Sequence, residues 1–293
     1  MDGVIVVDKP RDWTSHDVVN KMRRLAGTRK VGHLGTLDPA ATGVLPLVIG
    51  RATRLAQFYT RNDKIYEGVV HFGYSTNTYD AEGERTSDEV AVELGRTALE
   101  SALQAFRGPF DQVPPPVSAK KIGGRKAYEF ARKLQPVELK AVPVEVYSLE
   151  VLGIAGSETQ VRVHCSAGTY LRSIAHAAGQ AMGCGAVLKS LRRIASGHFK
   201  IESARTLEDL AALAAEDRLS EVLIPAALLL PEFPSEMVDA ITVGQIRNGR
   251  DFRVSPFQVR QGAPYVKAIN QQGDLVAIGE ARLPHVYHPV LVL

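Results

Sequence analysis

The sequence predicts an α+β fold with a mixed or antiparallel sheet, followed by a small C-terminal β-barrel. Short β-branched runs alternate with only a few helical stretches, which favours α+β over a regular βαβ wind. Residues 231–234 begin and end with proline and are typical of a linker. After them come short apolar runs divided by Gly and Asn turns, which is the pattern of a small barrel.

The N-terminal elements come in a clear order. Residues 3–7 form a short strand, and Thr14 and Ser15 then begin a helix that ends at Gly27. Residues 30–46 contain three Gly and two Pro, so we expect a structured loop there rather than one regular element. The apolar run 44–49 is either a strand or the start of a buried helix.

The middle of the chain alternates strands and helices. We expect strands over 64–73, 142–152 and 159–165, and helices over 93–106, 170–182 and 207–230. Residues 74–83 are a turn-rich stretch, and three consecutive prolines, 114–116, must be extended. The basic segment after them has the pattern of a hairpin and a helix inserted between core strands.

These elements define two domains. The first covers residues 1–230, with the basic insertion at about 114–140, and the second covers residues 235–293. We expect the strands of the second domain at 241–242, 252–254, 264–269, 275–279 and 290–292.

Composition excludes several classes of protein. With 45% hydrophobic and 23% charged residues among 293, the chain is not disordered. Its longest apolar run, 222–230, is too short for a membrane helix, and the N-terminus lacks the pattern of a signal peptide, so we expect a cytoplasmic protein without membrane contact. Its two cysteines, Cys165 and Cys184, have no CxxC spacing, which argues against a disulfide framework and a zinc site.

Charge is segregated along the chain. Residues 118–140 carry seven basic and two acidic side chains, a balance of +5, and residues 189–200 carry four cations and no acid. Residues 202–239, in contrast, are rich in Glu and Asp. Such segregation is typical of a face that binds a polyanion, although a solvated surface gives the same pattern.

Asp38 is the strongest single candidate for chemistry. A Gly-rich segment precedes it and Pro39 follows it, so its backbone is stiff and its small neighbours leave room for a substrate. Its carboxylate could be a nucleophile or a general base, or Asp-Pro could merely begin a turn. The sequence lacks the GxSxG, HExxH and GxxxxGK[ST] motifs of other enzyme classes.

The segment GHLGTLDPAATGVLP resembles the signature of the bacterial tRNA pseudouridine-55 synthases, which isomerise one uridine of the tRNA T-loop. Further segments resemble the same family in the expected order and cover most of residues 3–200: VVDKPRDWTSHDVV, DKIYEGVVHFG, SAKKIGGRKAYEFAR, HCSAGTYLRSIAHAAG and LKSLRRIASGHF. The resemblance implies a pseudouridine synthase catalytic domain with an inserted basic RNA-gripping segment, closed by a PUA-type β-barrel.

The resemblance also implies roles for single residues. Asp38 would attack the target nucleoside covalently, Arg172 would pair with Asp38, and Tyr66 would stack on the base and could serve proton transfer from C5. Tyr170 and Leu191 would line the pocket. Tyr170 and Leu191 could equally be core residues. A strand tyrosine is more often part of the core, but in this motif we expect Tyr66 to be functional. The alternative for Arg172 is a surface arginine.

The resemblance to this family also implies which residues bind RNA. The target uridine must leave the stacked loop, and His33 would fill the gap, unless it is a loop histidine bonded to backbone. The insertion would hold the tRNA backbone through Lys120, Lys121, Arg125 and Lys126. The role of Asp80 stays open, and Lys9 and Pro10 would support the site. The implied partner is the T-arm of tRNA. No cofactor, metal or protein partner is implied, and we expect a monomer.

Two alternatives remain. An RNA-guided pseudouridine synthase shares TSHDVV-like and GTLDP-like segments and also ends in a PUA-type domain, but the SAKKIGGRKAYEFAR insertion belongs to the stand-alone type. A non-catalytic RNA-binding protein or tRNA chaperone could be built on the same fold. Retention of Asp38, Tyr66 and Arg172 argues against that alternative.

Overall fold

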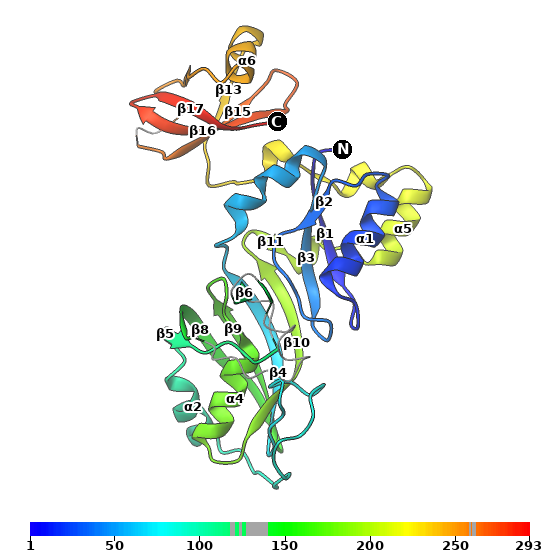
Figure 1. Ribbon diagram of the computed structural model, residues 1–293, viewed down its shortest axis with the longest axis vertical. Helices are drawn as coiled ribbons and strands as arrows, with labels where there is room; N and C mark the ends of the chain where they lie inside the picture. The colour runs from blue at the N-terminus through cyan, green and yellow to red at the C-terminus, as the bar shows by residue number, and fades with distance from the viewer. Residues whose placement is uncertain (118–120, 123–124, 127–139, 258, 260–261) are drawn as a thin grey trace.

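The computed structural model describes residues 1–117, 121–122, 125–126, 140–257, 259 and 262–293. Within this part of the chain, residues 3–225 contribute the strands of a ten-stranded sheet and residues 235–292 those of a five-stranded sheet. A separate two-stranded ribbon consists of β6 (Lys121–Ile122) and β7 (Arg125–Lys126). Figure 1 shows the five-stranded sheet at one end of an elongated molecule, close to the N-terminus.

The large sheet is mixed. Its strands are β1 (Gly3–Lys9), β2 (Val31–His33), β3 (Thr42–Ile49), β4 (Lys64–Phe72), β5 (Gly108–Gln112), β8 (Val142–Ala155), β9 (Glu158–Cys165), β10 (Ala186–Ser196), β11 (Phe199–Lys200) and β12 (Ile224–Pro225). They follow the order β12-β1-β3-β10-β4-β9-β8-β5, with β2 beside β3 and β11 beside β10. Strand β10 runs parallel to β3 and antiparallel to β4. Strands β1 and β3 are almost wholly buried, which explains their continuous apolar sequences, whereas β4 alternates.

Helices cover the sheet in two groups. The α-helices of this part are α1 (Ser15–Leu25), α2 (Arg96–Gln104), α4 (Leu171–Ala181) and α5 (Leu207–Ala215), and the 3₁₀ segments are η1 (Gly50–Tyr59), η2 (Ile201–Ser203), η3 (Leu219–Val222) and η4 (Ala226–Leu228). Helices α1 and α5 pack together near β1, and α4 packs on β10 beside α2 (Figure 1). The α+β fold with a mixed sheet, as predicted, is therefore confirmed.

The C-terminal sheet is curled and carries one helix. Its strands are β13 (Ser235–Met237), β14 (Phe252–Arg253), β15 (Tyr265–Ile269), β16 (Leu275–Leu283) and β17 (Val286–Val292), in the order β13-β15-β16-β17-β14, and its helix is α6 (Ala240–Arg247). The buried Lys267 ties this sheet to the preceding segment, because its Nζ donates to the carbonyls of Ala227 (3.0 Å) and Leu229 (2.9 Å). This agrees with the barrel-like second unit predicted from the sequence.

The structure corrects several predicted elements. The helix predicted over 207–230 ends at Ala215, and residues 224–225 instead pair with β1, because Pro225 cannot continue a helix. Residues 241–242, predicted as strand, lie in α6, whose N-terminus Asp239 caps. The predicted basic hairpin is present as β6 and β7, and the helix predicted after it falls on residues 127–139, outside the described residues. No helix of the described part is long and apolar enough to cross a bilayer.

Candidate active site

The loop between β2 and β3 carries Asp38, and its backbone is fixed by buried neighbours. Leu37 is buried, and its N–H donates to the hydroxyl of Ser15 at the start of α1 (2.9 Å) while the same hydroxyl donates back to the Leu37 carbonyl (3.0 Å). The N–H of Ala41 closes a turn onto the Asp38 carbonyl (3.1 Å). The glycine- and proline-rich sequence therefore folds into one defined loop.

Lys9, at the end of β1, holds this loop from one side. Its side chain is fully buried, and its Nζ donates to the carbonyls of Pro10 (2.8 Å), Trp13 (2.7 Å) and Pro39 (3.0 Å). Burial lowers the pKa of Lys9 to about 8. All three acceptors of this amine are backbone carbonyls, and one of them belongs to Pro39, so Lys9 fixes the residue that follows Asp38.

Arg193, on β10, holds the loop from the other side. It is 1% exposed, and its guanidinium donates to the carbonyls of Val44 (2.7 Å), Gly35 (3.1 Å) and Thr36 (3.3 Å). Gly43 is required where β3 meets β10, because its φ is +99° and a Cβ there would lie 2.2 Å from the Arg193 carbonyl oxygen.

Arg172, on α4, is the ion-pair partner of Asp38. Its Nη2 lies 2.9 Å from Oδ2 of Asp38, and its Nη1 lies 3.5 Å from Oδ2 of Asp80. The same guanidinium donates to the carbonyls of Thr78 and Val117, each at 3.0 Å. The Arg172 side chain is 7% exposed while that of Asp38 is 45% exposed, so the arginine is fixed and the carboxylate faces solvent.

Tyr66 lies on β4 in register with Arg193 of β10 and is 9% exposed. Burial raises the pKa of Tyr66, and the nearby Asp38 carboxylate adds to this, although Arg193 opposes it. Its phenol is therefore protonated at neutral pH. The Asp38 loop, β4, β10 and α4 meet at this point, which brings Asp38, Tyr66 and Arg172 into one site.

The other candidate residues lie on several elements. Half-buried Leu191 is paired with Gly68 across β10 and β4. Tyr170 precedes α4, and its backbone exchanges two hydrogen bonds with the Gln112 side chain (2.8 and 3.1 Å). The Nδ1 of His33, at the end of β2, accepts the N–H of Gly35 (3.3 Å). Lys120 and the side chains of Lys121, Arg125 and Lys126 lie outside what the structure describes.

Sequence reasoning missed the support behind Arg172. Asp80, whose role was left open, contacts Arg172, and its Oδ1 accepts the Thr78 hydroxyl (2.6 Å). Between them, Tyr79 has a φ of +66°, and its ring stacks on His176 of α4 with centroids 3.8 Å apart. A non-glycine residue in this conformation is strained and persists only where its surroundings fix it. A tyrosine inside a turn-rich segment gives no signal of this in sequence.

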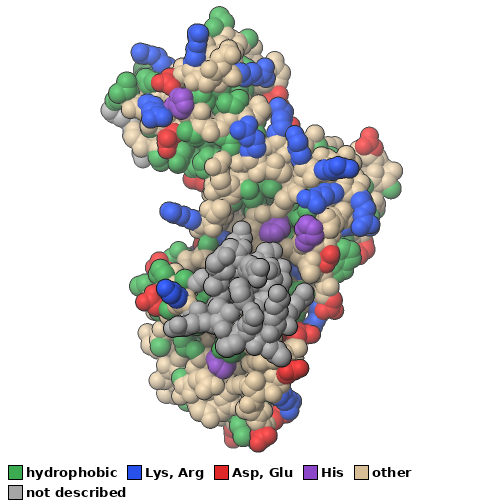
Figure 2. All heavy atoms as spheres, viewed as in Figure 1, with side chains coloured by type: hydrophobic (Ala, Val, Ile, Leu, Met, Phe, Trp, Pro, Cys, Tyr) green, Lys and Arg blue, Asp and Glu red, His purple; other side chains and the backbone are tan. Residues whose placement is uncertain are grey.

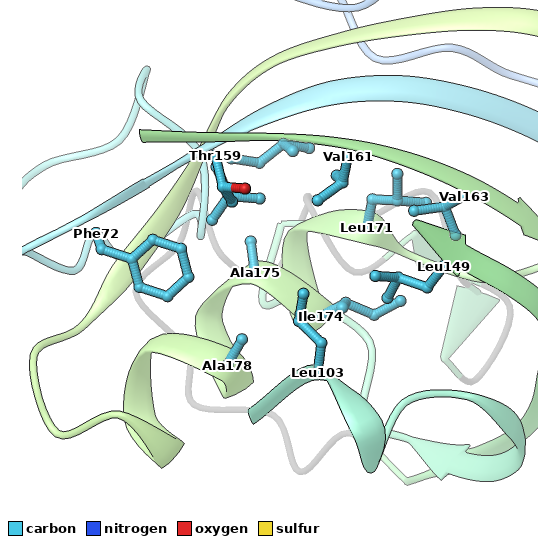
Figure 3. Close-up of a pocket in the computed structure, with 12 residues that line it drawn as sticks. Phe72, Leu103, Leu149, Thr159, Val161, Val163, Leu171, Ile174, Ala175 and Ala178 are labelled. Carbon is cyan, nitrogen blue, oxygen red and sulfur yellow. The ribbon is translucent and has the colours of Figure 1, made fainter. Parts of the chain in front are cut away.

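A small cavity in the core is not the substrate pocket. Figure 3 shows it between the sheet and α4, and its lining is apolar apart from Thr159, whose hydroxyl donates to the Gly153 carbonyl. At about 20 Å³ it has room for roughly one water molecule, and an apolar lining leaves such a space dry. The candidate site is instead the exposed carboxylate of Asp38. Among the described residues, no group of three or more His, Cys, Asp or Glu is arranged to hold a metal ion.

Comparisons with known proteins identify the family. Residues 23–171 match the N-terminal domain of the TruB family of pseudouridylate synthases, and residues 172–230 match the tRNA pseudouridylate synthase B C-terminal domain. The chain is 63% identical over 293 residues to the tRNA pseudouridine synthase B of Solibacter usitatus, covering 100% of both. This chain belongs to the TruB family.

More distant relatives of this TruB family member support the same family assignment. The tRNA pseudouridine synthase B of Mycobacteroides abscessus is 44% identical over 253 residues, covering 85% of this chain and 83% of its own. Among solved structures, a Cbf5-Nop10-Gar1 complex matches with a TM-score of 0.71 and 28% identity over 97% of this chain and 79% of that chain. An H/ACA RNP bound to a substrate RNA containing 2′-deoxyuridine matches with a TM-score of 0.73 and 26% identity, over 99% and 84%.

Proposed function

We propose that this chain isomerises uridine 55 in the T-loop of tRNA to pseudouridine, and that Asp38 attacks the target nucleotide. That it is a pseudouridylate synthase acting on tRNA follows from its family and its full-length relative. The observation that carries the assignment to Asp38 is its ion pair with Arg172 at 2.9 Å, in which the arginine is buried and the carboxylate is open to solvent. A carboxylate is ionised at neutral pH and needs no activating base.

The reaction is an isomerisation, so substrate and product contain the same atoms. The C1′–N1 bond of uridine breaks, the uracil turns, and a C1′–C5 bond forms, while C5 loses a proton and N1 takes one up. The bond that Asp38 forms to the nucleotide breaks again before the product leaves, which regenerates the carboxylate. In this proposal Arg172 pairs with the Asp38 carboxylate and aims it at the nucleotide. The Tyr66 ring stacks on the base. Because its phenol is protonated at neutral pH, Tyr66 can accept the C5 proton only if it passes its own proton on.

Substrate access requires the uridine to leave its stack, at a cost of a few kcal/mol. We assign the filling of the gap to His33 at the end of β2, and the apolar wall that retains the detached uracil to Tyr170 and Leu191. The insertion supplies salt-dependent affinity for the tRNA backbone through Lys120, Lys121, Arg125 and Lys126. We further propose that the enzyme acts alone, as a monomer in the cytoplasm.

The likeness to a Cbf5-Nop10-Gar1 complex (28% identity) and to an H/ACA RNP bound to a substrate RNA (26% identity) keeps an RNA-guided enzyme as the second candidate. The two differ in what the purified protein can do. A stand-alone enzyme converts unmodified tRNA without a guide RNA, and an RNA-guided enzyme does not.

Single-site pseudouridine mapping tests the proposal, using unmodified tRNA and the purified full chain without added RNA. We expect conversion confined to the T-loop uridine. We expect Asp38→Asn to abolish conversion and to bind tRNA within about threefold of wild type, since one amide replaces one carboxylate of similar size. Asp111→Asn, at an exposed position on β5, is the matched control and should stay active. Full activity of Asp38→Asn, or conversion at other uridines only, contradicts the proposal.

A further inference from the structure

A run of positive charge leads from α1 to β2. Between residues 20 and 30 the chain carries five cations and no acid, and we call these residues the basic strip: Lys21, Arg23, Arg24, Arg29 and Lys30. Helix α1 buries Ser15, Val18, Val19 and Met22. Within the strip Arg24, Arg29 and Lys30 are exposed, whereas Lys21 and Arg23 are half-buried. Arg23 donates to the Asn20 side chain (3.1 Å) and to the Val31 carbonyl (3.3 Å). Among the described residues, none of the five lies within ion-pair distance of a carboxylate. Figure 2 shows Lys and Arg side chains gathered over α1 on the face in view.

The backbone under the strip is stiff. The turn after α1 passes through Gly27 at φ +60°, and the N–H of Thr28 donates to the Arg23 carbonyl (3.1 Å). The N–H of Lys30 donates to the Thr28 hydroxyl (3.2 Å), and the Lys30 carbonyl accepts the N–H of Gly50 (2.8 Å). The fold therefore holds like charges close together, and their mutual repulsion falls when an anion lies across them.

The strip begins close to the candidate active site. Ser15 is bonded to Leu37, the residue before Asp38, and α1 rises about 1.5 Å per residue, so Lys21 and Arg24 lie about 9 and 14 Å further along the helix. A nucleic-acid duplex carries several phosphates over such a length, at about one charge per 1.7 Å.

An open groove lies between the strip and the segment that precedes α1. Its lining contains the only tryptophan of the chain, Trp13, beside two strip cations: Asp12, Trp13, Asp17, Asn20, Lys21 and Arg24. The N–H of Asp12 donates to the Pro39 carbonyl (2.9 Å), which places this end of the groove next to Asp38. The two acids balance Lys21 and Arg24, so the net positive charge lies toward Arg29 and Lys30.

We propose that the basic strip and the Trp13 groove bind the phosphodiester backbone of the same tRNA whose uridine lies at Asp38. This inference rests on the proposed function. It adds a second contact surface, on described residues and separate in sequence from the insertion at 114–140. Cations along phosphates release condensed counterions, so each contact adds to the salt dependence of binding.

A charge-reversal pair tests the strip. Arg24→Glu with Arg29→Glu changes two exposed strip residues, and Arg96→Glu with Arg218→Glu makes the same change in charge at arginines that already pair with glutamates. We expect the strip variant to bind tRNA at least tenfold more weakly at about 0.1 M salt, and its log–log salt slope to fall by about 1.4 to 1.8. The control should bind like wild type.

Trp13 gives a local readout. Saturating tRNA should protect its fluorescence from acrylamide quenching, because RNA in the groove covers the ring. If wild-type protein converts tRNA but the strip variant binds like the control, or Trp13 is not protected, the strip inference is wrong and the proposed function stands. If wild-type protein neither binds nor converts tRNA, the proposed function itself fails.

Discussion

Replacing Arg172 should slow the isomerisation far more than it weakens tRNA binding. The guanidinium makes two contacts to carboxylates, at 2.9 Å to Asp38 and 3.5 Å to Asp80. A charge-assisted hydrogen bond contributes about 1.5–3 kcal/mol. Arg172→Lys keeps the charge but loses the planar pair of nitrogens, so we expect one such contact to be lost. At about 1.36 kcal/mol per tenfold, the rate constant should fall roughly 10- to 150-fold.

Arg172→Met removes both carboxylate contacts and also the hydrogen bonds to the Thr78 and Val117 carbonyls. The two carboxylate contacts contribute at most about 3–6 kcal/mol, so the rate constant should fall by up to roughly 10²- to 10⁴-fold. The assay is single-turnover release of tritium from tRNA labelled at uridine C5, because the C5–H bond breaks during isomerisation. Filter binding of the same tRNA gives the Kd. With its side chain 7% exposed, Arg172 has little surface to offer RNA, so the Kd should change less than about threefold. Unchanged rates, or a rise in Kd as large as the fall in rate, would refute this reasoning.

Two further predictions concern the buried Lys64 and the half-buried Tyr79. Lys64 is 8% exposed, and burial, with Arg193 nearby, lowers its pKa from 10.5 to about 8. The unfolded chain therefore binds more protons between pH 8 and 10.5, so wild-type stability should rise relative to Lys64→Met across that window, by at most about 3 kcal/mol in urea unfolding. A pH-independent difference would contradict this. Tyr79→Ala should lower kcat about tenfold by freeing the segment that holds Arg172, whereas Tyr79→Phe keeps the stack on His176 and should restore the rate. An equal fall in kcat in both variants would show that the stack of Tyr79 on His176 does not support the rate.

The loop that carries Asp38 could be predicted because its sequence is unusual for local physical reasons. Glycine and proline exclude a regular element over residues 30–46, and Asp38 is the one carboxylate in that run. The short strand at the N-terminus and the barrel-like end were also predictable, since β-branched runs and Gly turns depend on near neighbours in sequence.

The centre of the sheet could not be predicted in the same way. Strand β10 lies between β3 and β4, yet its sequence, AVLKSLRRIAS, contains three cations and has the pattern of a solvated face. Arg193 is buried there because loop carbonyls far away in sequence receive its donors. The strand at 224–225 likewise forms only because β1 offers it an edge. Such long-range pairings leave no periodic signal.

Buried cations also explain how the Asp38 loop is fixed while its carboxylate stays exposed. Lys9 and Arg193 each donate to three backbone carbonyls. These carbonyl dipoles take the place of the water molecules that each cation loses when it is buried. Both cations therefore bind the backbone of the loop and not the Asp38 carboxylate. Among the described residues, Arg172 is the one cation within ion-pair distance of that carboxylate. Had Lys9 or Arg193 paired with Asp38 inside the core, the carboxylate would be buried and out of reach of RNA. The proposed attack requires both features: a loop backbone that Lys9 and Arg193 hold in place, and an exposed carboxylate that Arg172 alone orients.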